Sequence, residues 1–186
     1  MEEMQYYSHC NYRRKLVLIA VMSAIAVVSR SMFYMLPQVK PMAAVILITG
    51  AAVGRRSGAL TGMVSALVSN FIFGQGPWTL WQMVAFGLLG YLSGCLFSGK
   101  QINGKKRLVI FALFSGASVF LLYGFIMDTG AAFMSFQKVN STILLATYIS
   151  GAPLNAIHGI STLLFVFLMG NALFRKLYRI QKKYGL

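Results

Sequence analysis

Residues 70–94, NFIFGQGPWTLWQMVAFGLLGYLSG, decide how the rest of the chain is arranged. Apolar residues flank this stretch on both sides, and the glycines and proline of residues 74–77 cannot continue a helix. The stretch therefore predicts a tight hairpin between two membrane helices. Trp78 just after the turn is typical of an anchor at the membrane interface, whereas the pair Gln75 and Gln82 favours the mouth of a ligand site.

Composition predicts a membrane protein. Of the 186 residues, 58% are hydrophobic and 11% are charged. A bilayer core of about 30 Å needs roughly 20 apolar residues per helix, so six helices with short loops use nearly all of the chain. The predicted fold class is all-α, a polytopic bundle of six transmembrane helices. The expected helices cover residues 16–34, 41–53, 57–73, 80–97, 108–127 and about 142–174.

The net charge of +14 is unevenly distributed along the chain. All lysines and arginines except Arg30, Lys40 and Lys138 fall on one side of the expected membrane. Because positive loops stay in the cytoplasm, both termini are predicted to be cytoplasmic. The charge is then a topology signal that also attracts anionic lipids of the bilayer, and no nucleic acid is expected as a partner. Residues 1–15 form a cytoplasmic segment, residues 16–174 the membrane domain and residues 175–186 a basic cytoplasmic tail.

Polar residues inside the expected helices are costly to bury and need partners. Arg30, near the outer end of the first helix, must either snorkel outward or face a wet cavity. Tyr148, Asn155 and His158 share one face of the last helix. This face indicates either hydrogen bonds between helices or a substrate cavity. Asp128 is expected to begin the longest outer loop, residues 128–141, where it caps a turn or contacts a ligand.

The sequence contains no arrangement that is typical of catalysis. It has no acid pair, no Ser-His-acid set in a recognisable context, no metal-ligand cluster and no phosphate-binding loop. We therefore predict that the protein is not an enzyme and holds no metal or cofactor. If it pumps a substrate, a partner must hydrolyse the ATP.

Ala20 and Ala24 of the first helix let another helix approach closely, either within this bundle or from a partner. This spacing, the six-helix pattern and residues 73–94 together resemble the substrate-binding S components of energy-coupling factor (ECF) vitamin transporters. The segment FGQGPWTLWQMVAFGLLGYLSG is most similar to the cobalamin-specific type. The resemblance covers the whole membrane part of the chain.

The resemblance implies a multi-pass subunit of the bacterial cytoplasmic membrane that captures a vitamin, most like cobalamin, on the outer face. A transmembrane coupling subunit and two ATPase subunits would then drive uptake, with Ala20 and Ala24 docking on the coupling subunit. Riboflavin, folate, a queuosine precursor and a scaffold without a ligand are the alternatives. The implied substrate-binding residues are Arg30, Tyr34, Gln75, Trp78, Trp81, Gln82, Asp128, Tyr148, Asn155 and His158.

Overall fold

The computed structural model describes residues 2–102 and 104–185, with side chains from Tyr12 onward. Most of the described residues are helical, and no strand occurs among them, which confirms the all-α class. One helical run, Lys105–Ser135, combines α5, a π-helical turn η1 and α6 without interruption. The elements are α1 (Glu2–Met32), α2 (Met42–Val53), α3 (Arg55–Phe73), α4 (Trp78–Phe97), α5 (Lys105–Ser118), η1 (Val119–Tyr123), α6 (Gly124–Ser135) and α7 (Ser141–Tyr184).

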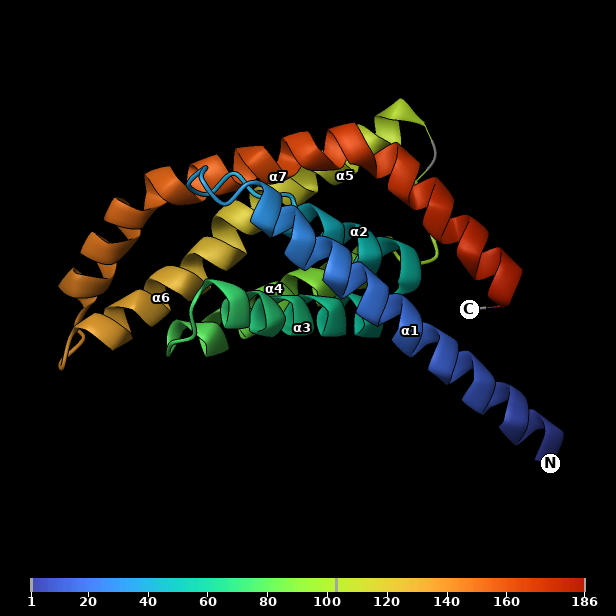
Figure 1. Cartoon of the computed structure of the whole chain (residues 1–186). Helices are drawn as coiled ribbons and strands as arrows, with labels where there is room; N and C mark the ends of the chain where they lie inside the picture. Colours follow the sequence, from blue (N-terminus) through green and yellow to red (C-terminus); the bar gives the residue numbers. More distant parts are fainter. Residues whose placement is uncertain (1, 103, 186) are drawn as a thin grey trace.

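Four helical stretches of the described chain are long and apolar enough to cross a membrane: Tyr12–Met32, Trp78–Phe97, Lys105–Ser135 and Ser141–Tyr184. α2 is also apolar but has only 12 residues. Every residue of α2 from Met42 to Ala52 is buried, and α1, α3, α4 and α7 surround it (Figure 1). The bundle therefore covers this short helix. The number of membrane crossings stays a prediction.

α3 and α4 pack backbone against backbone. A Cβ added to Gly58 would overlap the carbonyl oxygen of Gly90, and one added to Gly90 would overlap that of Gly58. Gly62 meets the backbone of Phe86 in the same way, and Gly50 of α2 meets the Gly90 carbonyl. These glycines therefore form the packing surfaces between the helices, because only residues without a side chain let three backbones approach this closely.

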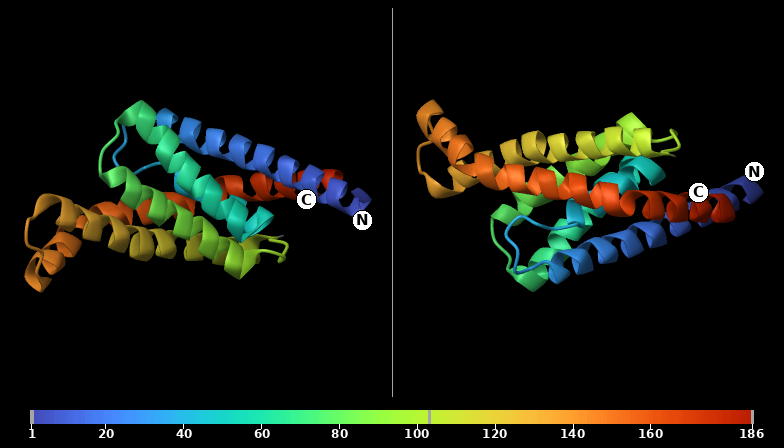
Figure 2. Two further views of the ribbon diagram at one scale, coloured as in Figure 1. Left: turned by 90° about the horizontal axis from the view of Figure 1, so that it is seen from below. Right: turned by 90° about the horizontal axis from the view of Figure 1, so that it is seen from above.

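The two chain termini lie at the same end of the molecule (Figures 1 and 2). α7 arches over the bundle with Pro153 inside it, and it continues to Tyr184. The expected end of the last helix at residue 174 is therefore wrong. The tail residues remain helical because they have partners: Tyr178 Oη accepts from Ile102 N at 3.1 Å, and Gln181 Nε2 donates to Ala52 O at 2.7 Å. α1 likewise runs unbroken through residues 15 and 16.

The expected loop at residues 128–141 is also wrong in its first part, because α6 continues to Ser135. The sequence Asp-Thr-Gly at 128–130 is typical of a turn. Here Thr129 Oγ1 donates back to Phe125 O at 2.6 Å, and Gly130 lies against the ring of Trp81. Packing on α4 and α7 thus keeps a turn-like sequence helical.

We expect Gly90→Ala to destabilise the fold, because the new methyl group must push α3 and α4 apart. Overpacking of this kind costs on the order of 1 to 3 kcal/mol in the free energy of unfolding. Val84→Ile adds a carbon at an exposed position of the same helix and serves as the control. Thermal unfolding in detergent measures both. Equal melting temperatures for the two variants would show that the close contact is unimportant.

Candidate functional site

A small polar cavity of about 80 Å³ lies where α1 ends and α2 begins, facing α4, η1 and α7. It has room for a few water molecules. We call it the polar cavity. Its lining residues are Arg30, Gln38, Lys40, Met42, Gln82, Phe86, Tyr123 and His158.

Arg30 points into the bundle. Its Nη1 donates to Ser69 Oγ at 2.6 Å and to Asn70 Oδ1 at 2.9 Å, and its guanidinium lies 5.0 Å from the centre of the Phe73 ring. Arg30 thus lines the polar cavity and does not snorkel outward. These contacts fix the outer end of α1 against α3.

Asn70 is the centre of this hydrogen-bond network. It is 1% exposed, and its Nδ2 donates to Thr79 Oγ1 at 2.9 Å and to Gln82 Oε1 at 2.8 Å. With Arg30 on its oxygen, one amide side chain joins α1, α3 and α4. Gln82 also lines the polar cavity, and its amide nitrogen is a hydrogen-bond donor.

Aromatic rings form another part of the cavity wall. The His158 ring is 4% exposed and packs edge-on against Tyr123 at 4.8 Å and Phe86 at 6.4 Å between ring centres. Tyr123 ends the π-helical turn η1, a feature frequent at functional sites. His158 Nδ1 has no hydrogen-bond partner among the described residues. A buried nitrogen without a partner costs about 1 to 3 kcal/mol, so a bound molecule that contacts it would gain affinity.

The loop between α1 and α2 supplies the remaining polar groups. Gln38 has a φ of 60°, a left-handed conformation that is strained for a residue with a side chain and that clusters at functional sites. Lys40 is half-buried; burial lowers the pKa of its ammonium, and the nearby Arg30 lowers that pKa further. Among the described residues that line the polar cavity, none is acidic. The cavity is therefore a positively charged site that suits an electron-rich ligand.

Three predicted site residues form a second group between α6 and α7. Asn155 Nδ2 donates to an Asp128 carboxylate oxygen at 2.8 Å. Tyr148 Oη lies 2.8 Å from Thr129 Oγ1. These pairs follow the interpretation in which the polar face of the last helix joins helices. Asp128 caps no turn, because it lies within α6.

The structure does not bring the two tryptophans together. Trp78 is 42% exposed, and its ring lies against Gly76. Trp81 instead stacks on Phe133 of α6, with ring centres 6.4 Å apart and planes 7° from parallel. Neither ring lines the polar cavity.

Two more predicted residues lie near the cavity but outside its lining. Tyr34 is exposed and stacks on Phe73 at 5.0 Å, next to the Arg30 guanidinium. Gln75 is exposed and accepts a hydrogen bond from Thr79 Oγ1 at 2.9 Å. Both residues support the network without lining the cavity.

Sequence reasoning thus found Arg30, Gln82 and His158 of the polar cavity and missed five lining residues. Lys40 was counted only as an outer charge. The sequence signal for Lys40 was its position just before a short apolar helix. A helix too short to span the membrane starts below the membrane surface, so the residue before it is partly buried. The remaining missed residues, for which the pattern offers no comparable signal, are Gln38, Met42, Phe86 and Tyr123.

Comparison with known families agrees with this geometry. The model of the family described as "ECF-type riboflavin transporter, S component" matches residues 11–175. The chain belongs to this family. The predicted ECF S component is therefore confirmed, whereas the cobalamin-specific type stays a prediction. Neither the curated proteins nor the solved structures gave a match.

In this S component, Ala20 and Ala24 lie on the outward face of α1. Both are exposed, as are Val17, Val21 and Val28 on the same helix. The alternative in which the two alanines pack inside the bundle is wrong. A partner helix therefore has free access to them.

We expect Asn70→Leu to lower the free energy of unfolding of the S component by about 1 to 3 kcal/mol, because Arg30, Thr79 and Gln82 each lose a partner. Gln75→Leu removes an exposed amide from the edge of the same network and should have a smaller effect. Chemical denaturation in detergent compares the two variants. An equal loss in both would show that Asn70 is not the centre of the network.

Proposed function

We propose that this S component captures a flavin, riboflavin or a close relative, at the polar cavity on the outer face of the membrane. Uptake is then driven by a transmembrane coupling subunit and two ATPase subunits. Two findings support the flavin: the family description and the chemistry of the cavity. The chemistry of the cavity carries the proposal, because it concerns side chains of this chain.

The isoalloxazine ring of riboflavin is flat and carries carbonyl oxygens and ring nitrogens along one edge. Arg30, Lys40 and Gln82 offer hydrogen-bond donors for such an edge. Phe86, Tyr123 and His158 offer aromatic contacts for the ring. One compact set of donors beside one aromatic cluster is the usual composition of a site for a planar heterocycle.

Cobalamin is the alternative substrate. A broad corrin ring would suit an aromatic wall made of Trp78 and Trp81 beside Gln82. Because the two tryptophan rings point to different neighbours, this wall is not formed. A flavin needs only the side chains that do line the polar cavity.

The polar cavity must open before it can hold a vitamin. At about 80 Å³ it is smaller than the roughly 300 to 1,000 Å³ of typical ligand pockets. Residues 33–41 contain no α-helix and contribute Gln38 and Lys40 to the wall. This loop is the part of the wall that can move outward most easily, because helix packing does not hold it.

We expect Gln82→Ala to weaken riboflavin binding by on the order of 1 to 3 kcal/mol, since a buried polar contact is lost. Gln137→Ala makes the same change at an exposed residue far from the network and outside the lining, and it should leave the affinity unchanged. Quenching of flavin fluorescence in detergent measures both variants, with size-exclusion profiles to check folding. A retained corrin spectrum without flavin quenching would support cobalamin. The absence of binding by any vitamin would support the scaffold alternative.

We also expect Ala20→Leu combined with Ala24→Leu to prevent copurification of the coupling subunit, because bulky side chains block the close approach of a partner helix. Riboflavin affinity should remain, since neither alanine lines the polar cavity. Ala172→Leu, at an exposed alanine of α7, is the matched control. Unchanged copurification of the double variant would place the docking surface elsewhere.

A further inference from the structure

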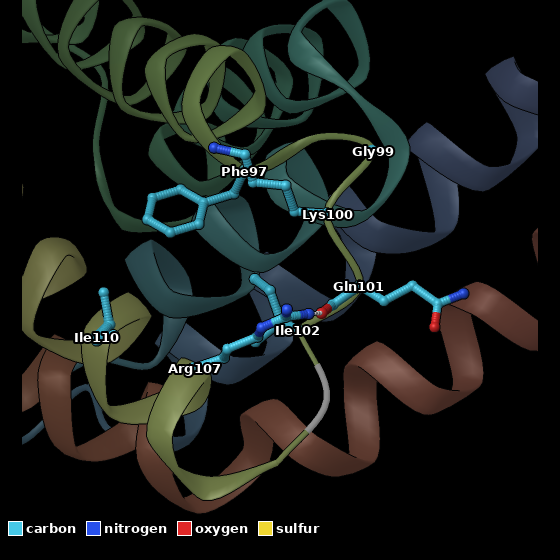
Figure 3. Close-up of a pocket in the computed structure, with 7 residues that line it drawn as sticks. All are labelled: Phe97, Gly99, Lys100, Gln101, Ile102, Arg107 and Ile110. Atoms are coloured by element: carbon cyan, nitrogen blue, oxygen red, sulfur yellow. Dashed lines mark hydrogen bonds between the residues drawn. The ribbon is translucent and has the colours of Figure 1, made fainter.

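A second cavity, of about 380 Å³, lies at the junction of α4 and α5 (Figure 3). It is on the side that carries most of the basic residues, and no step of vitamin capture uses it. We call it the basic cavity. Its lining residues are Phe97, Gly99, Lys100, Gln101, Ile102, Arg107 and Ile110.

Two cations line the basic cavity and keep free hydrogen-bonding capacity. Lys100 Nζ donates to Leu96 O at 3.0 Å, and Arg107 Nη1 donates to Gln101 O at 2.9 Å. An ammonium group has three N–H donors and a guanidinium group has five, so these bonds leave several donors for a ligand.

No acidic side chain that the structure describes neutralises this charge. Asp128 is the one acidic residue among the described side chains, and it is paired with Asn155 between α6 and α7. The first turn of α5 contains Lys105, Lys106 and Arg107, no acid and no side-chain cap. Cations at the positive end of a helix dipole are unfavourable. A bound anion would offset this interaction with the dipole and would also balance the unneutralised positive charge.

Apolar side chains continue from the basic cavity along the neighbouring helices. Ile110 of the lining is 51% exposed, Leu113 one turn further along α5 is 56% exposed, and Leu96 of α4 is 50% exposed. A soluble anion would gain nothing from this surface. A phosphate group that carries acyl chains would contact both the cations and the apolar side chains.

We propose that the basic cavity binds the phosphate of an anionic phospholipid, such as phosphatidylglycerol, in the inner leaflet. The phosphate accepts hydrogen bonds from Lys100 and Arg107, and an acyl chain lies along Ile110 and Leu113. Basic pockets at the cytoplasmic ends of membrane helices bind lipid headgroups in this way. The bound lipid also stabilises the α4–α5 loop, which Tyr178 of α7 already holds through Ile102 N and Lys100 O.

The test titrates the purified S component in mild detergent with phosphatidylglycerol or zwitterionic phosphatidylcholine and counts bound lipids by native mass spectrometry. We expect one phosphatidylglycerol molecule to bind before any other lipid. The double variant Lys100→Gln, Arg107→Gln should lower this affinity by about tenfold or more, because two charges in contact with the phosphate are lost.

The matched control is Arg175→Gln with Lys176→Gln, which removes the same charge from exposed residues of α7 outside the lining. This control should bind almost as well as the unchanged protein. Equal losses of affinity in both double variants would show that the lipid responds only to the overall positive charge. This result would overturn the proposal. Displacement of the lipid by millimolar inorganic phosphate would assign the site to a soluble anion and would also overturn it.

A second measurement needs no variant and therefore stands if Arg107→Gln fails to fold. A photoreactive phosphatidylglycerol is added to the unchanged S component, and the labelled peptides are identified after digestion. The proposal expects labels on residues 96–113. Labels confined to other helices would overturn it. The outcome is independent of vitamin binding, because the polar cavity shares no residue with the basic cavity.

Discussion

The contact between the backbones of α3 and α4 is the constraint on which the rest of the structure depends. Gly58, Gly62 and Ala66 recur every four residues on one face of α3, and Asn70 continues that face at its end. Because the glycines bring α4 so close, Asn70 reaches Gln82 at 2.8 Å. The packing that holds the helices together therefore also places the polar groups of the site.

The bilayer explains why this polar network must be complete. Inside a membrane no water satisfies a stray amide or guanidinium group, so each one must find a partner in the protein. Arg30, Asn70 and Gln82 satisfy one another, whereas His158 Nδ1 is buried without a hydrogen-bond partner among the described residues. A site with two cations and free donors is prepared for an electron-rich ligand. At the α4–α5 junction, a second excess of positive charge binds lipid phosphate instead.

Much of the fold could be predicted because it depends on local patterns. The helix class, the turn at residues 74–77 and the burial of the short α2 follow from apolar runs and from glycine and proline positions. Arg30 and His158 could be identified because polar groups in a membrane helix are costly. Tyr123 could not, because nothing in its sequence neighbourhood indicates a π-helical turn or a contact with α7. The same limit explains why α6 and α7 are longer than expected: their last turns are stabilised by residues far away in the chain.

The most direct test of vitamin capture by an S component is uptake of radiolabelled riboflavin into proteoliposomes. We expect no accumulation against a gradient when this chain is reconstituted alone, because it contains no motif that binds ATP. Accumulation should appear when the coupling subunit, the two ATPase subunits and ATP are added, and unlabelled riboflavin should abolish it. Accumulation by this chain alone, or uptake of cobalamin but not riboflavin by the full complex, would contradict the proposed function.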